Sequence, residues 1–184
     1  MAMRMKRYIS ITALLFVFLL LNTQLGYSLD LALPQNTPVK VYFSPKGGCT
    51  DAIIKEIEQA KTDIFVQAYS FTSAPIAKAL VDSRKKGVKV QAILDKSQRS
   101  EKYTSATFLT NAGIITYIDD NHAIAHNKIM IINRETVITG SFNFTKAAEE
   151  KNAENVLIIK DKALAKGYIE NWEKHKRHSE PYGR

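Results

Sequence analysis

As far as about residue 118, segments in which apolar residues have a strand-like spacing are followed by segments in which they have a helical spacing. This arrangement predicts strands separated by helices. The strand-like segments, in which apolar residues alternate or form short continuous runs, are 39–43, 64–69, 88–94 and 114–118. Between them, apolar residues three or four positions apart predict a helix after Thr50, a second after Ser73 and a weaker third over about residues 103–111. Gly87 and Gly113 are expected to end the second and third helices, because glycine readily adopts the conformation found there.

Short apolar segments lie closer together in the rest of the chain. Residues 126–132, 136–140 and 155–159 are strand-like and predict adjacent strands, and a helical pattern from 162 to about 175 follows them. The predicted fold is therefore an α/β layered sandwich with a central mixed β-sheet flanked by helices. No internal repeat is visible, so each chemical motif occurs once in the chain.

The N-terminal segment has the pattern of an export signal. Arg4, Lys6 and Arg7 precede an apolar run over residues 9–21, and a more polar stretch with small residues follows. The 13 residues of this run are fewer than the roughly 20 needed to span a bilayer. We therefore expect a signal peptide over residues 1–28 and a periplasmic or secreted protein. The alternative is an uncleaved, tilted N-terminal membrane anchor.

The rest of the chain has the length of one domain, expected over residues 39–184 after an extended lead-in over residues 29–38. Lys and Arg total 26 against 18 Asp and Glu, and the formal charge of +8 stays positive without the three basic residues of the leader. This charge favours polyanionic partners such as nucleic acid or anionic lipid headgroups. Cys49 is the only cysteine, which excludes an intrachain disulfide and a cysteine-based zinc cluster.

Residues with catalytic chemistry gather in the closely spaced strands. The segment HNKIMIIN begins at His126, and alternation along a strand places His126 and Lys128 on the same side. A turn after this strand would return the chain so that the segment GSFNF, with Gly140, Ser141 and Asn143, lies beside them. We therefore expect these side chains to form one site.

Such a site suits a phosphate group. Lys128 and Asn143 would hold the non-bridging oxygens, and Ser141 could add a hydrogen-bond donor. Neutral His126 could attack phosphorus to give a phosphohistidine intermediate, a scheme that requires neither a metal ion nor a cofactor. A lone His near a strand end is usually an ordinary polar residue, but the four side chains together favour a catalytic site.

This pattern resembles the signature of the phospholipase D superfamily, in which His-x-Lys is followed by an Asp, a Gly-Ser pair and an Asn. His126, Lys128, Gly140, Ser141 and Asn143 match it. The segments FSPKGGCT and QAYSFTS also resemble the small, single-motif bacterial nucleases of this superfamily. The resemblance implies a phospholipase D-like fold, a covalent phosphohistidine mechanism and phosphodiesterase activity in the presence of chelators, with residues 39–184 as the catalytic domain.

The Asp of the signature corresponds to Asn133, which keeps an acceptor oxygen but has no charge. Strand alternation turns Asn133 away from His126, so we expect it to support the structure. The resembling nucleases carry a Glu at the spacing of Glu154 beyond their His, which implies that Glu154 orients the imidazole. The alternative for Glu154 is an ordinary charged residue at the start of a strand.

The remaining histidines do not extend the motif. His122 has no Lys two positions later and is expected in a loop. His175 and His178 lie among basic residues and are interpreted as a solvated helix end that could contact a phosphate backbone. Tyr69 could stack on a base, although an aromatic residue beside a strand more often belongs to the core.

A phosphohistidine mechanism needs a nucleophile and a general acid on opposite sides of phosphorus, and this chain supplies one suitable His. A homodimer with a shared active site would supply the second across a twofold axis. We therefore expect a homodimeric endonuclease that cleaves DNA or RNA with little sequence preference. A phospholipase D acting on phospholipid headgroups is one alternative. A catalytically silent nucleic-acid-binding protein is another, suggested by Asn133.

Overall fold

The structure, a computed structural model, describes residues 28–101 and 104–183. The expected signal peptide therefore lies, except for Ser28, outside the described residues. The expected lead-in over residues 29–38 contains no helix or strand, and the first strand begins at Val39. Within the described ranges, no helix is both long and apolar enough to cross a membrane.

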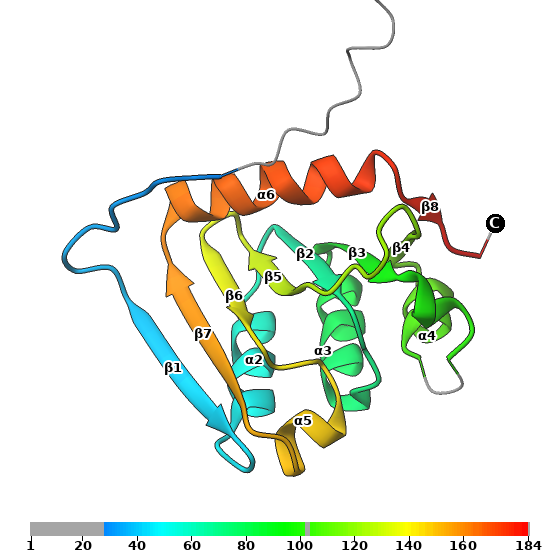
Figure 1. Ribbon diagram of the computed structural model, residues 1–184, viewed down its shortest axis with the longest axis horizontal. Helices are drawn as coiled ribbons and strands as arrows, with labels where there is room; N and C mark the ends of the chain where they lie inside the picture. Colours follow the sequence, from blue (N-terminus) through cyan, green and yellow to red (C-terminus); the bar gives the residue numbers. More distant parts are fainter. Residues whose placement is uncertain (1–27, 102–103, 184) are drawn as a thin grey trace, which may run out of the picture.

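An eight-stranded mixed β-sheet forms the centre of the described structure, with the strand order β1-β7-β6-β5-β2-β3-β4-β8 (Figure 1). β2 pairs with β3, and β3 with β4, in parallel, whereas the other neighbours are antiparallel. The strands are β1 Val39–Ser44, β2 Asp63–Ala68, β3 Lys89–Asp95, β4 Ile115–Asp119, β5 Lys128–Ile132, β6 Thr136–Gly140, β7 Glu154–Lys160 and β8 Glu180–Pro181. The predicted central mixed sheet is confirmed.

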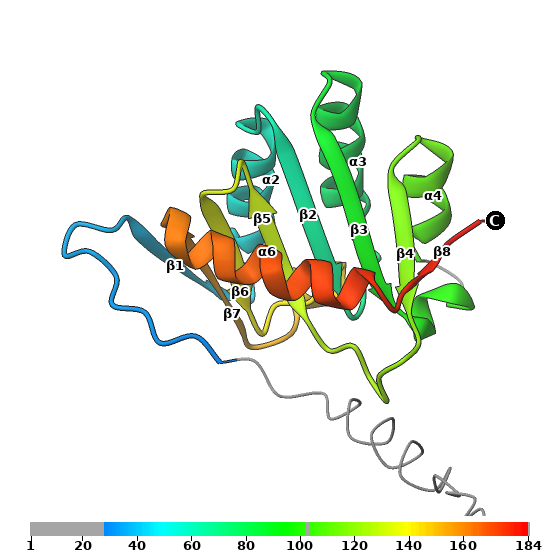
Figure 2. The ribbon, with the colours of Figure 1, turned by 90° about the horizontal axis from the view of Figure 1, so that it is seen from above.

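Helices cover both faces of this sheet (Figure 2). The helices are α2 Cys49–Glu58, α3 Ala74–Lys85, α4 Ala106–Asn111, α5 Lys146–Glu150 and α6 Lys162–Lys176, with a 3-10 turn, η1, at Lys96–Arg99. α2, α3 and α4 pack through the larger apolar core on one face. α6 packs on the other face through Trp172, which stacks on Phe65 at 5.0 Å between ring centroids and donates a hydrogen bond to the backbone oxygen of Val66.

The local differences from the predicted elements arise mainly from contacts distant in sequence. The predicted cap of α2, Thr50, is wrong: the N-cap is Gly48, and the carboxylate of Glu149 accepts hydrogen bonds from the backbone N–H groups of Gly48 and Thr50. β5 begins at Lys128, so that His126 lies in the preceding loop. The short elements α5 and β8 were not predicted from the apolar pattern.

The segments that follow β2 and β6 are joined at one end of the sheet. Phe71 forms a parallel bridge with Phe144, and their buried rings meet edge to face at 5.6 Å. The backbone N–H groups of Thr72 and Ser73 both donate to the oxygen of Phe144. Because Ala68 of β2 also pairs with Lys128 of β5, this end of the sheet brings the GSFNF segment close to the start of β5.

Candidate active site

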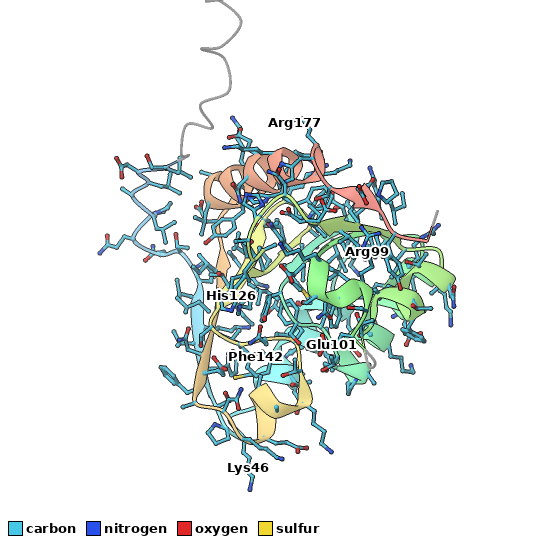
Figure 3. The ribbon with its side chains drawn as sticks, turned by 45° about the vertical axis from the view of Figure 1, so that its right-hand side comes forward. Lys46, Arg99, Glu101, His126, Phe142 and Arg177 are labelled. Carbon is cyan, nitrogen blue, oxygen red and sulfur yellow. The ribbon has the colours of Figure 1, made fainter. Side chains whose placement is uncertain are left out.

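His126 lies in the loop between β4 and β5, with an exposed side chain on an anchored backbone. The preceding residue, Ala125, is buried and donates a hydrogen bond from its backbone N–H to the carboxylate of Asp95 at 2.7 Å. The following residue, Asn127, accepts one from the backbone N–H of Tyr69 at 2.8 Å. The imidazole packs on the Tyr69 ring with 4.6 Å between centroids. His126 is therefore accessible but held in place (Figure 3).

Lys128, the first residue of β5, brings a cation to the same place. Its side chain is buried, its Nζ donates a hydrogen bond to the backbone oxygen of His126 at 2.8 Å, and the ammonium lies 5.1 Å from the centroid of the Tyr69 ring. Burial lowers the pKa of Lys128, and the negative charge of Glu154 partly opposes that effect. His126 and Lys128 are therefore brought together as expected, and the Tyr69 ring lies close to both side chains.

Gly140 and Ser141 lie where β6 approaches β7. Gly140 has a φ of 148°, and a Cβ atom added there would lie 2.2 Å from the backbone oxygen of Asn155, so a larger residue would disturb the pairing. The exposed Ser141 hydroxyl accepts a hydrogen bond from the backbone N–H of Asn155 at 3.1 Å. Its own proton remains available for a ligand oxygen.

Asn143 presents a polar group without a protein partner. The side chain lies between two buried neighbours, Phe142 and Phe144, and its backbone oxygen accepts a hydrogen bond from the N–H of Thr145 at 2.7 Å. Among the described residues, Oδ1 of Asn143 is buried and has no hydrogen-bond partner. This oxygen can accept a hydrogen bond only from a protonated group, whereas the N–H groups of the same amide are the donors that a phosphate oxygen would need.

Glu154 begins β7, where its backbone N–H donates to the hydroxyl of Ser44 at 3.2 Å. Its carboxylate is close enough to act electrostatically on Lys128 and accepts a hydrogen bond from the side chain of Asn152 at 3.3 Å. Within the described residues, no hydrogen bond joins this carboxylate to His126. Its role in orienting the imidazole therefore stays a prediction.

Asn133 lies in the turn between β5 and β6, at the opposite end of β5 from His126. It has a φ of 54°, and its Oδ1 accepts hydrogen bonds from the backbone N–H groups of Lys61 at 2.7 Å and Thr62 at 3.1 Å. These contacts agree with the expected supporting role. An amide oxygen can accept both of these bonds as a carboxylate would.

Tyr69 also lines a cavity of about 340 Å³. It is lined by Tyr69, Ser70, Ser97, Gln98, Ser100 and Glu101. Most of this part of the site was not predicted, because its residues come from the end of β2 and from η1. Two features of the sequence pointed to Tyr69, the QAYSFTS resemblance and its aromatic ring beside a predicted strand. The half-buried Tyr69 links the cavity to His126, so a chain longer than one phosphate group could extend from one to the other.

An exposed imidazole, a buried ammonium group, a hydroxyl proton and the N–H groups of a side-chain amide are groups that suit attack on a phosphodiester. The fold and the site define a phosphodiester hydrolase. A family profile described as "Cardiolipin synthase, PLD-like domain" matches residues 53–176. The chain belongs to the phospholipase D superfamily and, within it, to the branch of small single-motif enzymes similar to Nuc.

Relatives and solved structures agree with this assignment. A phospholipase D of Rickettsia prowazekii is 42% identical over 155 residues, which are 84% of this chain and 75% of the relative. Nuc, a phospholipase D family member from Salmonella typhimurium, has a TM-score of 0.76 and 39% identity, covering 79% of this chain and 98% of that chain. NucT from Helicobacter pylori, at 23% identity and a TM-score of 0.74, covers 79% of this chain and 99% of that chain and shares the fold.

Proposed function

We propose that this protein is a metal-independent endonuclease that cleaves DNA or RNA, with little sequence preference, through a phosphohistidine intermediate. The proposal rests on one observation. The exposed His126 imidazole lies beside the buried Lys128 ammonium group, which donates a hydrogen bond to the backbone oxygen of His126. The imidazole can reach phosphorus, while the cation is fixed where the negative charge of the transition state develops.

In the first step, a ring nitrogen of His126 attacks phosphorus and the bond from phosphorus to the leaving sugar oxygen breaks. Lys128 stabilises the non-bridging oxygens through its ammonium group, Ser141 through its hydroxyl proton and Asn143 through the N–H groups of its side-chain amide. Glu154 accepts a hydrogen bond from the other ring nitrogen and favours the imidazolium form as the bond to phosphorus forms. The product is a phosphate covalently attached to His126.

The second group needed for this reaction comes from a second copy of the chain. His126 of the partner subunit protonates the leaving oxygen, and it then removes a proton from the water that displaces the phosphate from the first His126. An exposed apolar strip on edge strand β1, formed by Val39, Val41 and Phe43, supports the proposed homodimer. The next residue along β1, Ser44, accepts a hydrogen bond from the backbone N–H of Glu154, so a dimer formed across this edge would lie near the residue that we propose orients His126.

Nucleic acid is the favoured substrate because the chain is basic and because Tyr69 offers an aromatic surface beside His126. Phospholipid remains the second candidate, since the similar Rickettsia proteins are named phospholipase D and the family description names cardiolipin synthase. A silent nucleic-acid-binding protein is less favoured, because the substitution at Asn133 lies away from the site.

The substrate can be tested by nicking of supercoiled plasmid DNA in excess chelator, beside release of headgroups from phosphatidylcholine and cardiolipin vesicles. The endonuclease proposal predicts plasmid nicking that is lost in His126→Ala. Headgroup release without nicking would identify a phospholipase, and plasmid binding without either activity would identify the silent binder.

Export to the periplasm or medium belongs to the same proposal, through the signal-like segment over residues 1–28. N-terminal sequencing of the protein from the periplasm and the medium should find a first residue near Leu29. An intact Met1 in a membrane pellet would support the anchor instead, and an intact Met1 in the cytosol would contradict both.

A further inference from the structure

Three histidines from two separate parts of the chain surround one buried carboxylate, that of Asp119. Asp119, the last residue of β4, is fully buried. Its carboxylate lies 3.0 Å from Nδ1 of His122, 3.0 Å from Nδ1 of His175 and 3.4 Å from Nε2 of His178. The ring centroids of the three histidines are 4.9 to 5.3 Å apart.

We propose that Asp119, His122, His175 and His178 bind a structural Zn²⁺ ion. One nitrogen from each imidazole and one carboxylate oxygen all lie within 4.8 Å of one another. In a tetrahedral zinc site with these ligands, neighbouring ligand atoms are about 3.4 Å apart. The nitrogen to oxygen distances of 3.0 to 3.4 Å are close to that value, so small shifts of the rings would admit the ion.

The chemistry of the four ligands favours zinc. Three imidazoles and one carboxylate suit Zn²⁺ in tetrahedral geometry, whereas Mg²⁺ and Ca²⁺ prefer six or more oxygen ligands. Four protein ligands leave no open position for substrate, which is typical of structural rather than catalytic zinc. The side chains of His122, His175 and His178 keep 34%, 16% and 23% of their surface exposed, so the ion can reach the site from solvent.

Hydrogen bonding alone explains this arrangement less well. The interpretation of His175 and His178 as a solvated helix end is wrong, because both side chains turn toward Asp119 and are largely covered. In the absence of a metal, the carboxylate can accept all three hydrogen bonds, but the three imidazole rings then lie 4.9 to 5.3 Å apart without a cation that they share. Histidines gathered this closely around one anion are therefore better explained as ligands that share a cation.

The proposed ion would fasten the loop that carries the nucleophile. It joins β4 and the β4–β5 loop to the C-terminal end of α6, which lies beside β4 (Figure 1). His122 is four residues before His126, and its backbone oxygen also accepts a hydrogen bond from Nζ of Lys96 at 2.9 Å. The ion would hold this loop without entering the phosphodiester reaction, so the proposal does not depend on which phosphodiester is cleaved.

The test uses the mature protein purified without a polyhistidine tag. Its metal content is measured by mass spectrometry. The protein is then dialysed against chelator, and Zn²⁺ is added back. We expect one Zn²⁺ per chain and a higher Tm with Zn²⁺ than without it. Substitution with Co²⁺ should give the visible absorption of a tetrahedral centre.

Variants locate the ion. His122→Gln and His178→Gln should each weaken Zn²⁺ binding by about 100-fold or more. The matched control His126→Gln, which removes a histidine from the same loop but outside the cluster, should bind Zn²⁺ as the wild type does. Absence of bound Zn²⁺ from the wild type, or equal binding by all of these proteins, would overturn the proposal. If a ligand variant does not fold, the cobalt spectrum of the wild type still decides between a tetrahedral centre and no site.

Discussion

The side chain of Lys128 donates a hydrogen bond from Nζ to the backbone oxygen of His126, 2.8 Å away. One strand residue thereby fixes the backbone of the proposed nucleophile and places a positive charge beside its imidazole. The ammonium group is buried to do so, and burial lowers its pKa. Lys128 is thus positioned for chemistry at some cost to the stability of the fold.

Lys128→Met should separate these two effects. Loss of the cation is expected to reduce kcat by about 10²- to 10³-fold, the range found for removal of one group that stabilises transition-state charge. The Tm should be unchanged or higher, because a buried ammonium group is replaced by an apolar side chain of similar length. Kinetics on a plasmid substrate and thermal unfolding measure the two effects. A variant that loses activity only because it unfolds near the assay temperature would contradict this account.

Stability at alkaline pH provides a second test of Lys128. Because its folded-state pKa is lowered from the usual 10.5, the unfolded state binds more protons in the pH range just below that value. The free energy of unfolding contributed by this group should therefore rise as pH increases through the folded pKa. Urea unfolding should be measured for the wild type and for Lys128→Met from about pH 8 to about pH 10. The free energy of unfolding of the wild type should increase relative to that of Lys128→Met over this range. A constant difference would argue against a lowered pKa.

Asn133→Asp and Asn133→Ala test the supporting role of this turn residue. Asn133→Asp keeps an oxygen for the N–H groups of Lys61 and Thr62 and should leave activity equal to the wild type or higher. Asn133→Ala leaves both donors without that partner and should lower the free energy of unfolding by about 1–3 kcal/mol. The folded Asn133→Ala protein should keep the wild-type kcat. Inactivation by Asn133→Asp would show that the residue takes part in the reaction.

Gly140→Ala tests the close approach of β6 and β7. The added Cβ would lie 2.2 Å from the backbone oxygen of Asn155, which must move, and Ser141 bonds to the same residue. Gly113→Ala is the matched control, since Gly113 also has a positive φ, of 78°, but no atom within 4 Å of the added Cβ. The control should lose about 1–2 kcal/mol of stability through its backbone conformation and keep its activity. Gly140→Ala should lose more stability and most of its activity, as measured by urea unfolding and plasmid nicking.

The sequence predicted the mixed sheet and the strands that carry the motif because apolar periodicity reflects burial, and the predicted range of β6 agrees with the structure. It could not predict that β1 pairs with β7, because a strand order set by residues far apart leaves no local pattern. The same reason applies to Glu149, which caps a helix about 100 residues earlier in the chain. Helix and strand propensities depend on residues that are neighbours in the sequence, so they do not predict these distant contacts.

The residues of the candidate site were predictable to different degrees. His126, Lys128 and Asn143 belong to one compact motif, so a strand and a single turn are enough to predict them as neighbours, although His126 lies in the loop before β5 and not on the strand. The histidine cluster was missed because His122 lies more than 50 residues before His175. Only the packing of α6 against the sheet brings their rings to 4.9 Å.

A hybrid dimer tests whether two chains share one phosphate site. A heterodimer of one wild-type chain and one His126→Ala chain would lack either the nucleophile or the general acid. Its activity should therefore fall nearly as far as that of the dimer in which both chains carry His126→Ala. Differently tagged chains can be mixed, allowed to exchange and purified as the hybrid, with the wild-type and His126→Ala homodimers treated identically as controls. Chains that act independently would instead keep about half of the activity, because removal of one of two separate sites leaves the other intact, whereas groups that work as a unit are strongly non-additive. Half-maximal cleavage by the hybrid would rule out the shared site, even if the protein is a dimer and a nuclease. The general acid would then have to come from the same chain as the nucleophile.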